Sequence, residues 1–347
     1  MLEQKMKKDE FLSEKICHID VKEFDSTPII DFFEKMSFQA RNIAQAAKIY
    51  KKMIEEKNCT IILCLSGSLI SAGMKKVIVD LVKHNMVDVI ISSGAIIVDQ
   101  DFFEGLGFNH YRGTPFINDE LLRKKRIDRI YDTFIDENDL RICDMTISKI
   151  ANQLNHGVYS SREFIMEMGK HLKEKKTNRE SVVLECYRKH VPIFVPAFSD
   201  CSAGFGLLHH QYNKQNERKV SIDSVKDILE LTEIKSQSKN TGVFIIGGGV
   251  PKNFAQDVTV SADIINKDVN MHKYAIQITV ADVRDGGLSG STLKEAHSWG
   301  KIDDTFEQMV YAEASIAFPL IASFVYHQSN WKKRKARNLN RLLDQKK

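Results

Sequence analysis

The segment EAHSWGKIDD, residues 295 to 304, places a lysine where it could act as a nucleophile. A lysine attacks an electrophile only when it is neutral, and burial or neighbouring cations lower its pKa from the usual value of about 10.4. Trp299 offers an apolar face beside Lys301, and the same indole could hold a ligand's ammonium group by cation-π attraction. Gly300 leaves the approach free of a side chain. Because lysine is abundant in this chain, the alternative is that Lys301 is an ordinary solvated cation.

Four apolar segments are each followed by a turn of small residues. These turns are SGS (66–68) after IILCL, SSGA (92–95) after VDVII, SDCS (199–202) after VPIFVPAF, and GGG (247–249) after VFII. Small residues let the backbone approach phosphates, and a following helix offers free N–H groups. None of the turns matches G-x-G-x-x-G, and a single glycine turn has a purely conformational explanation. Together they predict a shared phosphate and ribose site.

Several acidic residues fall at or near the same strand ends. A carboxylate there can accept hydrogen bonds from ribose hydroxyls or pair with a substrate ammonium, although each one alone is more often a helix cap or a solvated turn residue. The candidates are Asp99, Asp200, Asp285, Glu295 and Glu313.

The elements that must position these residues alternate between strands and helices. Residues 31–56 have helical periodicity and predict one long helix, and residues 60–95 predict a strand, a turn, a helix and a strand. Further apolar strands are expected at 191–198, 241–249 and 273–280. Such strands are typical of a parallel sheet covered on both faces. The predicted fold is α/β, a Rossmann-like parallel sheet with helices on both faces, in a single large domain.

Composition excludes several classes of function. The 347 residues are 43% hydrophobic and carry a net charge of only +4, which does not favour a nucleic-acid or membrane partner. The six cysteines form no C-x-x-C pair, so we expect neither a metal site nor disulfides, and a reducing cytoplasm. The N-terminus lacks the apolar region of a signal peptide, and no stretch is long enough to span a bilayer.

We divide the chain into an N-terminal arm (1–25), a catalytic domain (26–330) and a basic C-terminal tail (331–347). The tail is expected to be a solvated helix, with an anion-binding arm as the alternative.

Six segments resemble the deoxyhypusine synthase family, in the same order and with similar spacing, between about residues 25 and 328. They are SGSLISAGM (66–74), LVKHNMVDVIISSGA (81–95), VPIFVPAFSD (191–200), TGVFIIGGGV (241–250), EAHSWGKI (295–302) and VYAEASIAFPL (310–320). KHNMVDV and SWGKI are specific to that family.

The resemblance implies transferase chemistry with NAD as the cofactor. NAD takes a hydride from spermidine to give an imine, Lys301 attacks it and retains a four-carbon amine as its own imine, and an acceptor amine then takes over that chain. This is covalent catalysis through a lysine Schiff base. The acceptor is a lysine of a translation factor, or else a small amine such as putrescine. The family further implies a homotetramer made of dimers, with the N-terminal arm reaching a neighbouring subunit.

The resemblance also assigns individual residues. The positions that match NAD contacts are Gly67, Ser71, Ser93, Asp200, Gly248, Gly249, Asp285, Glu313 and Ala314. The positions that match the polyamine pocket are Asp99, Asn253, Glu295, Trp299 and the catalytic Lys301.

Three positions depart from the eukaryotic pattern. Phe205 and Leu288 replace aspartates, and Asn253 replaces a histidine. Two missing hydrogen bonds to a charged substrate would cost about 3 to 6 kcal/mol if additive. The donor and acceptor amines therefore stay open between deoxyhypusine synthase-like and homospermidine synthase-like transfer. A non-catalytic NAD-binding or assembly protein is the alternative from another class.

Overall fold

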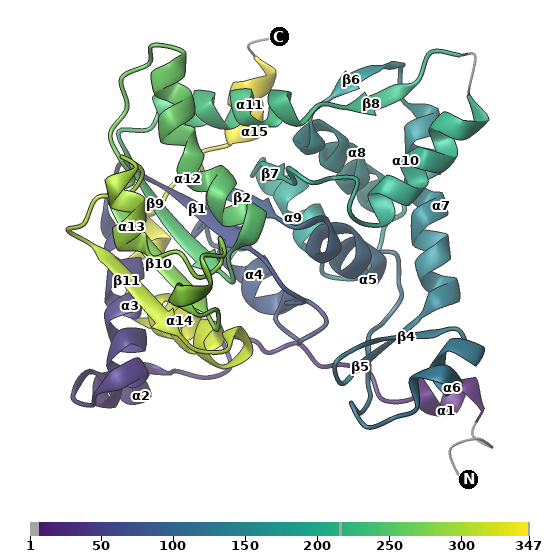
Figure 1. The fold of residues 1–347 in the computed structure, drawn as a ribbon, viewed down its shortest axis with the longest axis horizontal. Coiled ribbons are helices and arrows are strands. Elements are labelled where there is room, and N and C mark those ends of the chain that lie inside the picture. The colour runs from purple at the N-terminus through teal and green to yellow at the C-terminus, as the bar shows by residue number, and fades with distance from the viewer. Residues whose placement is uncertain (1–6, 215–216, 346–347) are drawn as a thin grey trace.

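A six-stranded parallel sheet forms the centre of the protein, and the computed structural model describes residues 7–214 and 217–345 (Figure 1). The strands are β1 (Cys59–Leu65), β2 (Val89–Ser92), β7 (Ile193–Phe194), β9 (Asn240–Ile246), β10 (Tyr274–Thr279) and β11 (Glu307–Tyr311). All five strand pairings are parallel. Every residue of β1, β2 and β10 is buried, as a sheet covered on both faces requires. The predicted fold class is confirmed.

Each face of the sheet has its own hydrophobic core, because successive side chains of a strand point to opposite faces. Ile61 and Leu63 lie in one core, and Ile62 and Cys64 lie in the other. The first core is covered by α3 (Phe38–Glu55), α4 (Lys75–Lys83) and α14 (Ala314–Gln328). The second is covered by α11 (Ser224–Ser236), α12 (Gly249–Ile264) and α13 (Leu293–Ser298).

The strand order, β11-β10-β9-β1-β2-β7, reverses direction beside β1. The chain first builds outward from β1 to β2 and β7, and then returns to the other side of β1 with β9, β10 and β11. In an open α/β sheet, a crevice forms beyond the carboxyl ends of the strands at such a reversal, because the connecting segments diverge to either side. This fold places that crevice between the turns that follow β1 and β9.

A smaller antiparallel sheet lies beside the main one, in the order β3-β5-β4 (Figure 1). Its strands are β3 (Tyr111–Arg112), β4 (Ile127–Ile130) and β5 (Thr133–Asp136), and it has a separate small core that contains Phe11 and Phe134. The other elements are α1 (Lys8–Phe11), α2 (Thr27–Glu34), the π-helix η2 (Ala95–Phe102), α5 (Phe103–Gly105), α6 (Asp119–Lys124), α7 (Glu137–Gln153), β6 (Gly157–Tyr159), α8 (Ser161–Glu174), α9 (Val182–Lys189), α10 (Ser202–Asn213), β8 (Val220–Ile222), the 3₁₀ turns η3 (Val283–Asp285) and η4 (Trp331–Lys333), and α15 (Leu339–Asp344).

The single long helix expected over residues 31–56 is wrong, since two helices, α2 and α3, occupy this region. Ser37 is extended and precedes α3, and Phe38 has a φ of 58°. Serine favours the position before a helix over a helix interior. The break between α2 and α3 therefore falls at Ser37.

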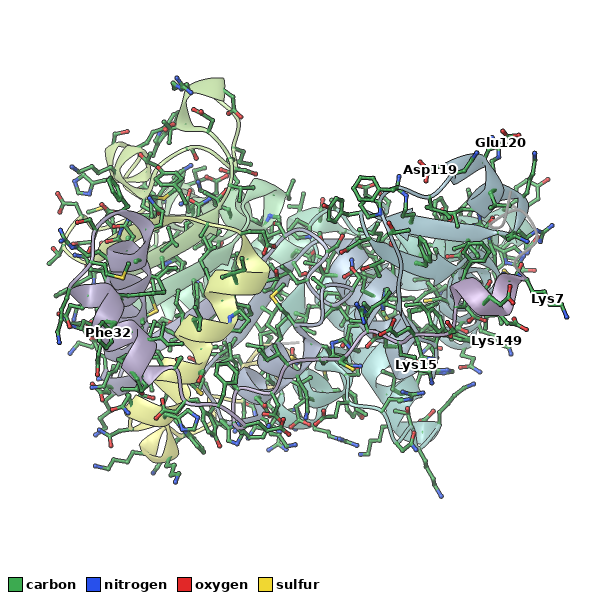
Figure 2. The ribbon with its side chains drawn as sticks, turned by 90° about the horizontal axis from the view of Figure 1, so that it is seen from below. Lys7, Lys15, Phe32, Asp119, Glu120 and Lys149 are labelled. Carbon is green, nitrogen blue, oxygen red and sulfur yellow. The ribbon has the colours of Figure 1, made fainter. Side chains whose placement is uncertain are left out.

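Residues 7–25 pack along the body of their own chain, and a contact of this segment with a neighbouring subunit stays a prediction. The amide of Ile16 donates to the carbonyl of His110 at 2.9 Å, and His18 lies 2.8 Å from the Glu104 carboxylate. Figure 2 shows Lys7 and Lys15 at one end of the molecule and Phe32 at the other. The first six residues lie outside the described residues.

The basic tail is also packed against the body, and the expectation of a solvated helix is wrong. Leu339 and Leu343 of α15 are buried in the second core. The Arg334 guanidinium pairs with the buried Asp88 carboxylate. Arg162, which is fully buried, donates to both oxygens of Glu230 and contacts Asp344 of α15 at 3.1 Å.

We expect the Glu230→Gln variant to lose about 3 to 5 kcal/mol of unfolding free energy, because it leaves the buried Arg162 charge without its bidentate partner. Urea denaturation followed by circular dichroism measures the loss. Glu120→Gln is the matched control, since Glu120 forms an exposed pair with Lys124 and the variant should leave the unfolding free energy almost unchanged. Equal losses in the two variants would contradict this role for the buried pair.

Candidate active site

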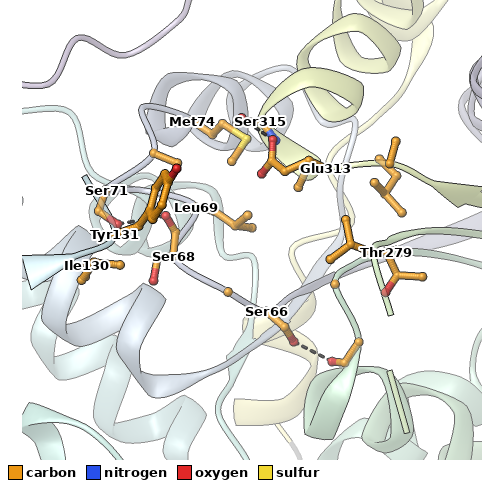
Figure 3. Close-up of a pocket in the computed structure, with 18 of the residues that line it drawn as sticks. Ser66, Ser68, Leu69, Ser71, Met74, Ile130, Tyr131, Thr279, Glu313 and Ser315 are labelled. Atoms are coloured by element: carbon orange, nitrogen blue, oxygen red, sulfur yellow. Dashed lines mark hydrogen bonds between the residues drawn. The ribbon is translucent and has the colours of Figure 1, made fainter. Parts of the chain in front are cut away.

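A cavity of about 760 Å³ occupies the crevice beyond the carboxyl ends of the strands (Figure 3). Its walls come from the segments that follow β1, β9, β10 and β11, four neighbouring strands of the sheet. The turn between β4 and β5 of the small sheet supplies a further wall, including Tyr131 and Asp132. The predicted cofactor residues that line this cavity are Gly67, Ser71, Gly248, Glu313 and Ala314.

Glycine is required at position 248 because another turn lies against its backbone. A Cβ atom there would be 2.6 Å from the Ser289 Cα atom. The Ser289 hydroxyl accepts a hydrogen bond from the amide of Gly249 at 3.0 Å, and the Ser66 hydroxyl donates to the carbonyl of Gly248 at 2.6 Å. The turns after β1, β9 and β10 are thereby held together, and α12 begins directly at Gly249.

Three of the predicted cofactor residues have structural roles of their own. The Ser71 hydroxyl donates to the carbonyl of Ser68 at 2.9 Å. Glu313 caps α14, because its Oε2 accepts from the amide of Ser315 at 2.8 Å. Asp285 does not line the cavity; its carboxylate accepts from the amide of Gly287 and shapes the loop that carries Ser289.

Lys301 lies just after the end of α13, in a turn made possible by Gly300, whose φ is 70°. Its amide donates to the carbonyl of Ala296 at 3.1 Å. Only 12% of the lysine side chain is exposed. Its Nζ atom is 2.6 Å from Oδ1 of Asp257 and 5.1 Å from the centre of the Trp299 ring.

This environment differs from the one expected for a neutral lysine. The indole of Trp299, which is 66% exposed, contacts the cation of Lys301 itself, and the pairing with Asp257 stabilises an ammonium group. The sequence predicted Trp299 beside Lys301 but not the Asp257 partner. A proton must leave Lys301 before it can attack an electrophile.

Asn253, Asp257 and Lys252 all project from α12 beside Lys301. The Asn253 amide donates to Oδ2 of Asp257 at 2.7 Å, one helical turn further along. Lys252 is fully buried, and its Nζ donates to the carbonyls of Leu288 and Ser291. Burial lowers the pKa of Lys252 to about 8, the charge of Glu295 opposes this, and the charge of Lys301 adds to it.

The Lys301 cluster is connected to the cavity through one loop. Lys252 holds residues 288 and 291 from one side, while Ser289 between them lines the cavity and contacts Gly249. Sequence reasoning missed Asp257, Lys252 and Ser289. The signal for Asp257 was its position four residues after Asn253 in a helix.

Ser93, Asp99 and Asp200 lie apart from this cavity, none of them lining it. They follow β2 and β7, on the other side of β1 from β9. The amide of Ser202 donates to the Asp99 carboxylate at 2.7 Å, and burial raises the pKa of Asp99 to about 6, with further contributions from the charges of Asp144 and Asp200. Within one chain, the expected site is therefore divided into three parts: the cavity, the cluster around Lys301, which does not line the cavity, and this third group.

Metal-binding clusters and membrane-spanning helices are both absent from residues 7–214 and 217–345. No group of three or more histidine, cysteine or acidic side chains is placed to hold a metal ion. No helix in these ranges is long and apolar enough to cross a membrane.

Comparisons with known proteins place these features in a family. Residues 28–325 match the family model "Deoxyhypusine synthase". The chain is 58% identical over 347 residues to a deoxyhypusine synthase-like protein of Chlorobaculum tepidum, covering all of this chain and 99% of that protein. It is 39% identical over 325 residues to a probable deoxyhypusine synthase 2 of Methanosarcina acetivorans, covering 93% of each.

A solved structure agrees in fold. The crystal structure of a putative deoxyhypusine synthase from Entamoeba histolytica superposes with a TM-score of 0.60 at 20% identity, covering 92% of this chain and 99% of that one. The protein has the α/β fold of a transferase family. It belongs to the deoxyhypusine synthase family, as the sequence motifs had indicated.

We expect Asp99→Asn to stabilise the protein by roughly 2 to 3 kcal/mol at pH 7. The raised folded-state pKa means that the folded chain disfavours the ionised carboxylate. This cost is absent below about pH 4, where the folded and unfolded chains are both protonated, and is complete above about pH 6. Urea midpoints between pH 4 and pH 7 should show the gain growing with pH. The exposed Asp263→Asn variant serves as the control, and a gain independent of pH would contradict the assignment.

Proposed function

We propose that this protein is an NAD-dependent aminobutyl transferase that acts through an imine on Lys301. The observation that carries the proposal is a nearly buried lysine paired with Asp257 of α12, the helix that begins at the strand-end cavity. Membership of the deoxyhypusine synthase family supports the same chemistry.

The strand-end cavity fits a dinucleotide. Gly67 has a φ of 94° and open space where a side chain would stand, and the small residues Gly248 and Ala314 line the cavity. These segments would hold the diphosphate, and Glu313, which keeps one oxygen beyond its capping bond, would accept from a ribose hydroxyl. When bound, NAD supplies the acceptor for a hydride taken from a donor amine and returns that hydride at the end.

Lys301 supplies the covalent step. Its amine attacks the imine carbon of the oxidised donor, releases a diamine and retains the four-carbon amine until an acceptor amine displaces it. Trp299 and Glu295 lie beside Lys301 in the sequence and would hold the donor's ammonium groups by cation-π attraction and charge pairing.

We further propose that Ser93, Asp99 and Asp200 complete the site of a neighbouring subunit in a homotetramer. Their separation from the cavity supports this, as does the apolar surface formed by Phe205 and Leu208 of α10, both more than half exposed. Light scattering of the purified protein tests the assembly, and a monomer at every concentration would exclude it.

The donor is expected to be spermidine, and the acceptor a protein lysine or a small amine. Phe205 and Leu288 lack the carboxylates of the eukaryotic pattern, so the acceptor is to be identified by its product. A new polyamine formed from spermidine and putrescine would assign homospermidine-type transfer. Release of 1,3-diaminopropane with transfer to a protein would assign deoxyhypusine-type transfer.

Incubation with NAD, spermidine and putrescine, followed by chromatography of the amines, tests the function. We expect 1,3-diaminopropane from the wild type and none from Lys301→Ala, because the covalent step is lost. Lys294→Ala, which removes an exposed lysine from α13, is the matched control and should retain activity. Bound NAD without release of any diamine would favour a non-catalytic binding protein and contradict the proposal.

A further inference from the structure

Asp257 has contacts that a surface acid does not need. Its Oδ1 is 2.6 Å from Nζ of Lys301, and its Oδ2 accepts a hydrogen bond from the Asn253 amide at 2.7 Å. Asn253 therefore fixes one carboxylate oxygen while the other contacts the lysine. Asp257 remains 33% exposed, so protons can reach it from water.

No other carboxylate in residues 7–214 and 217–345 lies within 4 Å of the Lys301 nitrogen. The other ionisable groups nearby have different positions or partners. Lys252 donates hydrogen bonds to the carbonyls of Leu288 and Ser291. Glu295 lies on the exposed side of α13, and its charge opposes the lowering of the Lys252 pKa. A proton leaving Lys301 thus has Asp257 as its direct acceptor.

We propose that Asp257 is the proton acceptor and counter-ion of the imine-forming lysine, an inference that rests on the proposed function of Lys301. A carboxylate at hydrogen-bond distance stabilises the ammonium before the reaction and the protonated imine after it. Asn253 is the positioning residue, because it orients the carboxylate from one helical turn away.

The exchange of amines balances with Asp257 as the relay. The Lys301 ammonium gives a proton to Asp257, and the freed electron pair forms a bond to the carbon of the donor's protonated imine, whose π electrons move to the donor nitrogen. Asp257 passes this proton to the donor nitrogen and then, again a carboxylate, accepts a second proton from the lysine nitrogen. The electron pair freed on the lysine nitrogen forms the new C=N bond while the donor nitrogen leaves with the electrons of its bond to carbon. Asp257 gives the second proton to the departed amine. The products are a protonated imine on Lys301, a carboxylate at Asp257 and a free ammonium, with no net oxidation or reduction.

A purely structural pair would behave differently. A partly exposed ion pair contributes little to stability, so losing it would change neither the fold nor the rate of imine formation by much. A proton relay contributes typically 100- to 10,000-fold to the rate of the step it serves. The rate of imine formation therefore separates the two roles.

The test is rapid-quench trapping of the Lys301 adduct with cyanoborohydride, followed by intact-mass analysis, in the presence of NAD and spermidine. We expect Asp257→Asn to form the adduct about 100-fold more slowly than the wild type, with an unchanged melting temperature. Asp257→Glu should recover at least a tenth of the wild-type rate because it restores the carboxylate. Asp263→Asn, on the same helix and exposed, should match the wild type. An equal rate in Asp257→Asn would overturn the inference.

A second probe separates this inference from the proposed function. Butanal forms an imine with a lysine without any hydride transfer, so it reports on Lys301 even if spermidine is not the donor. We expect butanal labelling of Lys301 to be at least tenfold slower in Asp257→Asn, with Lys301→Ala giving the background. If wild-type protein reacts with butanal but not with spermidine and NAD, the donor assignment fails and the role of Asp257 is still decided by the variant. Equal butanal rates in the wild type and Asp257→Asn would overturn that role.

Discussion

The reversal of strand order beside β1 is the constraint on which the rest of the structure depends. Because β9 pairs with β1 in parallel register from Cys59↔Asn240 to Leu65↔Ile246, the turns that follow these two strands must lie side by side. Gly248 is then required, since the turn that carries Ser289 leaves no room for a Cβ atom. The cavity, the start of α12 and the loop at residues 288–291 all follow from this pairing.

The same constraint places the lysine. Helix α12 begins directly after β9, so its first turns carry Lys252, Asn253 and Asp257 from the cavity toward the end of α13. There Gly300 allows the chain to turn and direct Lys301 at Asp257. The glycine-rich turn and the buried Lys252 thus lie at the start of the helix whose Asp257 pairs with Lys301, which links the proposed cofactor and covalent sites.

The sequence predicted the sheet well because buried parallel strands are almost continuously apolar, as in β1 and β10. It also identified Gly67 and Gly248 as cavity residues, since small residues after strands mark the carboxyl edge. Strand order depends on pairing between distant segments and cannot be obtained from local patterns. Ser93 and Asp200 were therefore grouped with residues from which the structure separates them.

The sequence did not predict the contact between Asp257 and Lys301 or the packing of the tail, for two different physical reasons. The contact between Asp257 and Lys301 joins residues 44 positions apart, so no spacing rule could show it. In the tail, the prediction rested on the lysines and arginines. Leu339 and Leu343 lie one helical turn apart and are buried in the second core. Charge described the surface of that segment, while two apolar residues determined where it packs.

The most direct test is a crystal structure of the protein with NAD and an unreactive spermidine analogue. We expect the dinucleotide in the cavity between the turns after β1 and β9, with one analogue molecule touching both the nicotinamide ring and the Lys301 amine. We also expect Asp99 and Asp200 of a neighbouring subunit at the same site. A dinucleotide bound elsewhere, or an analogue that reaches the ring but lies far from Lys301, would contradict the proposed function.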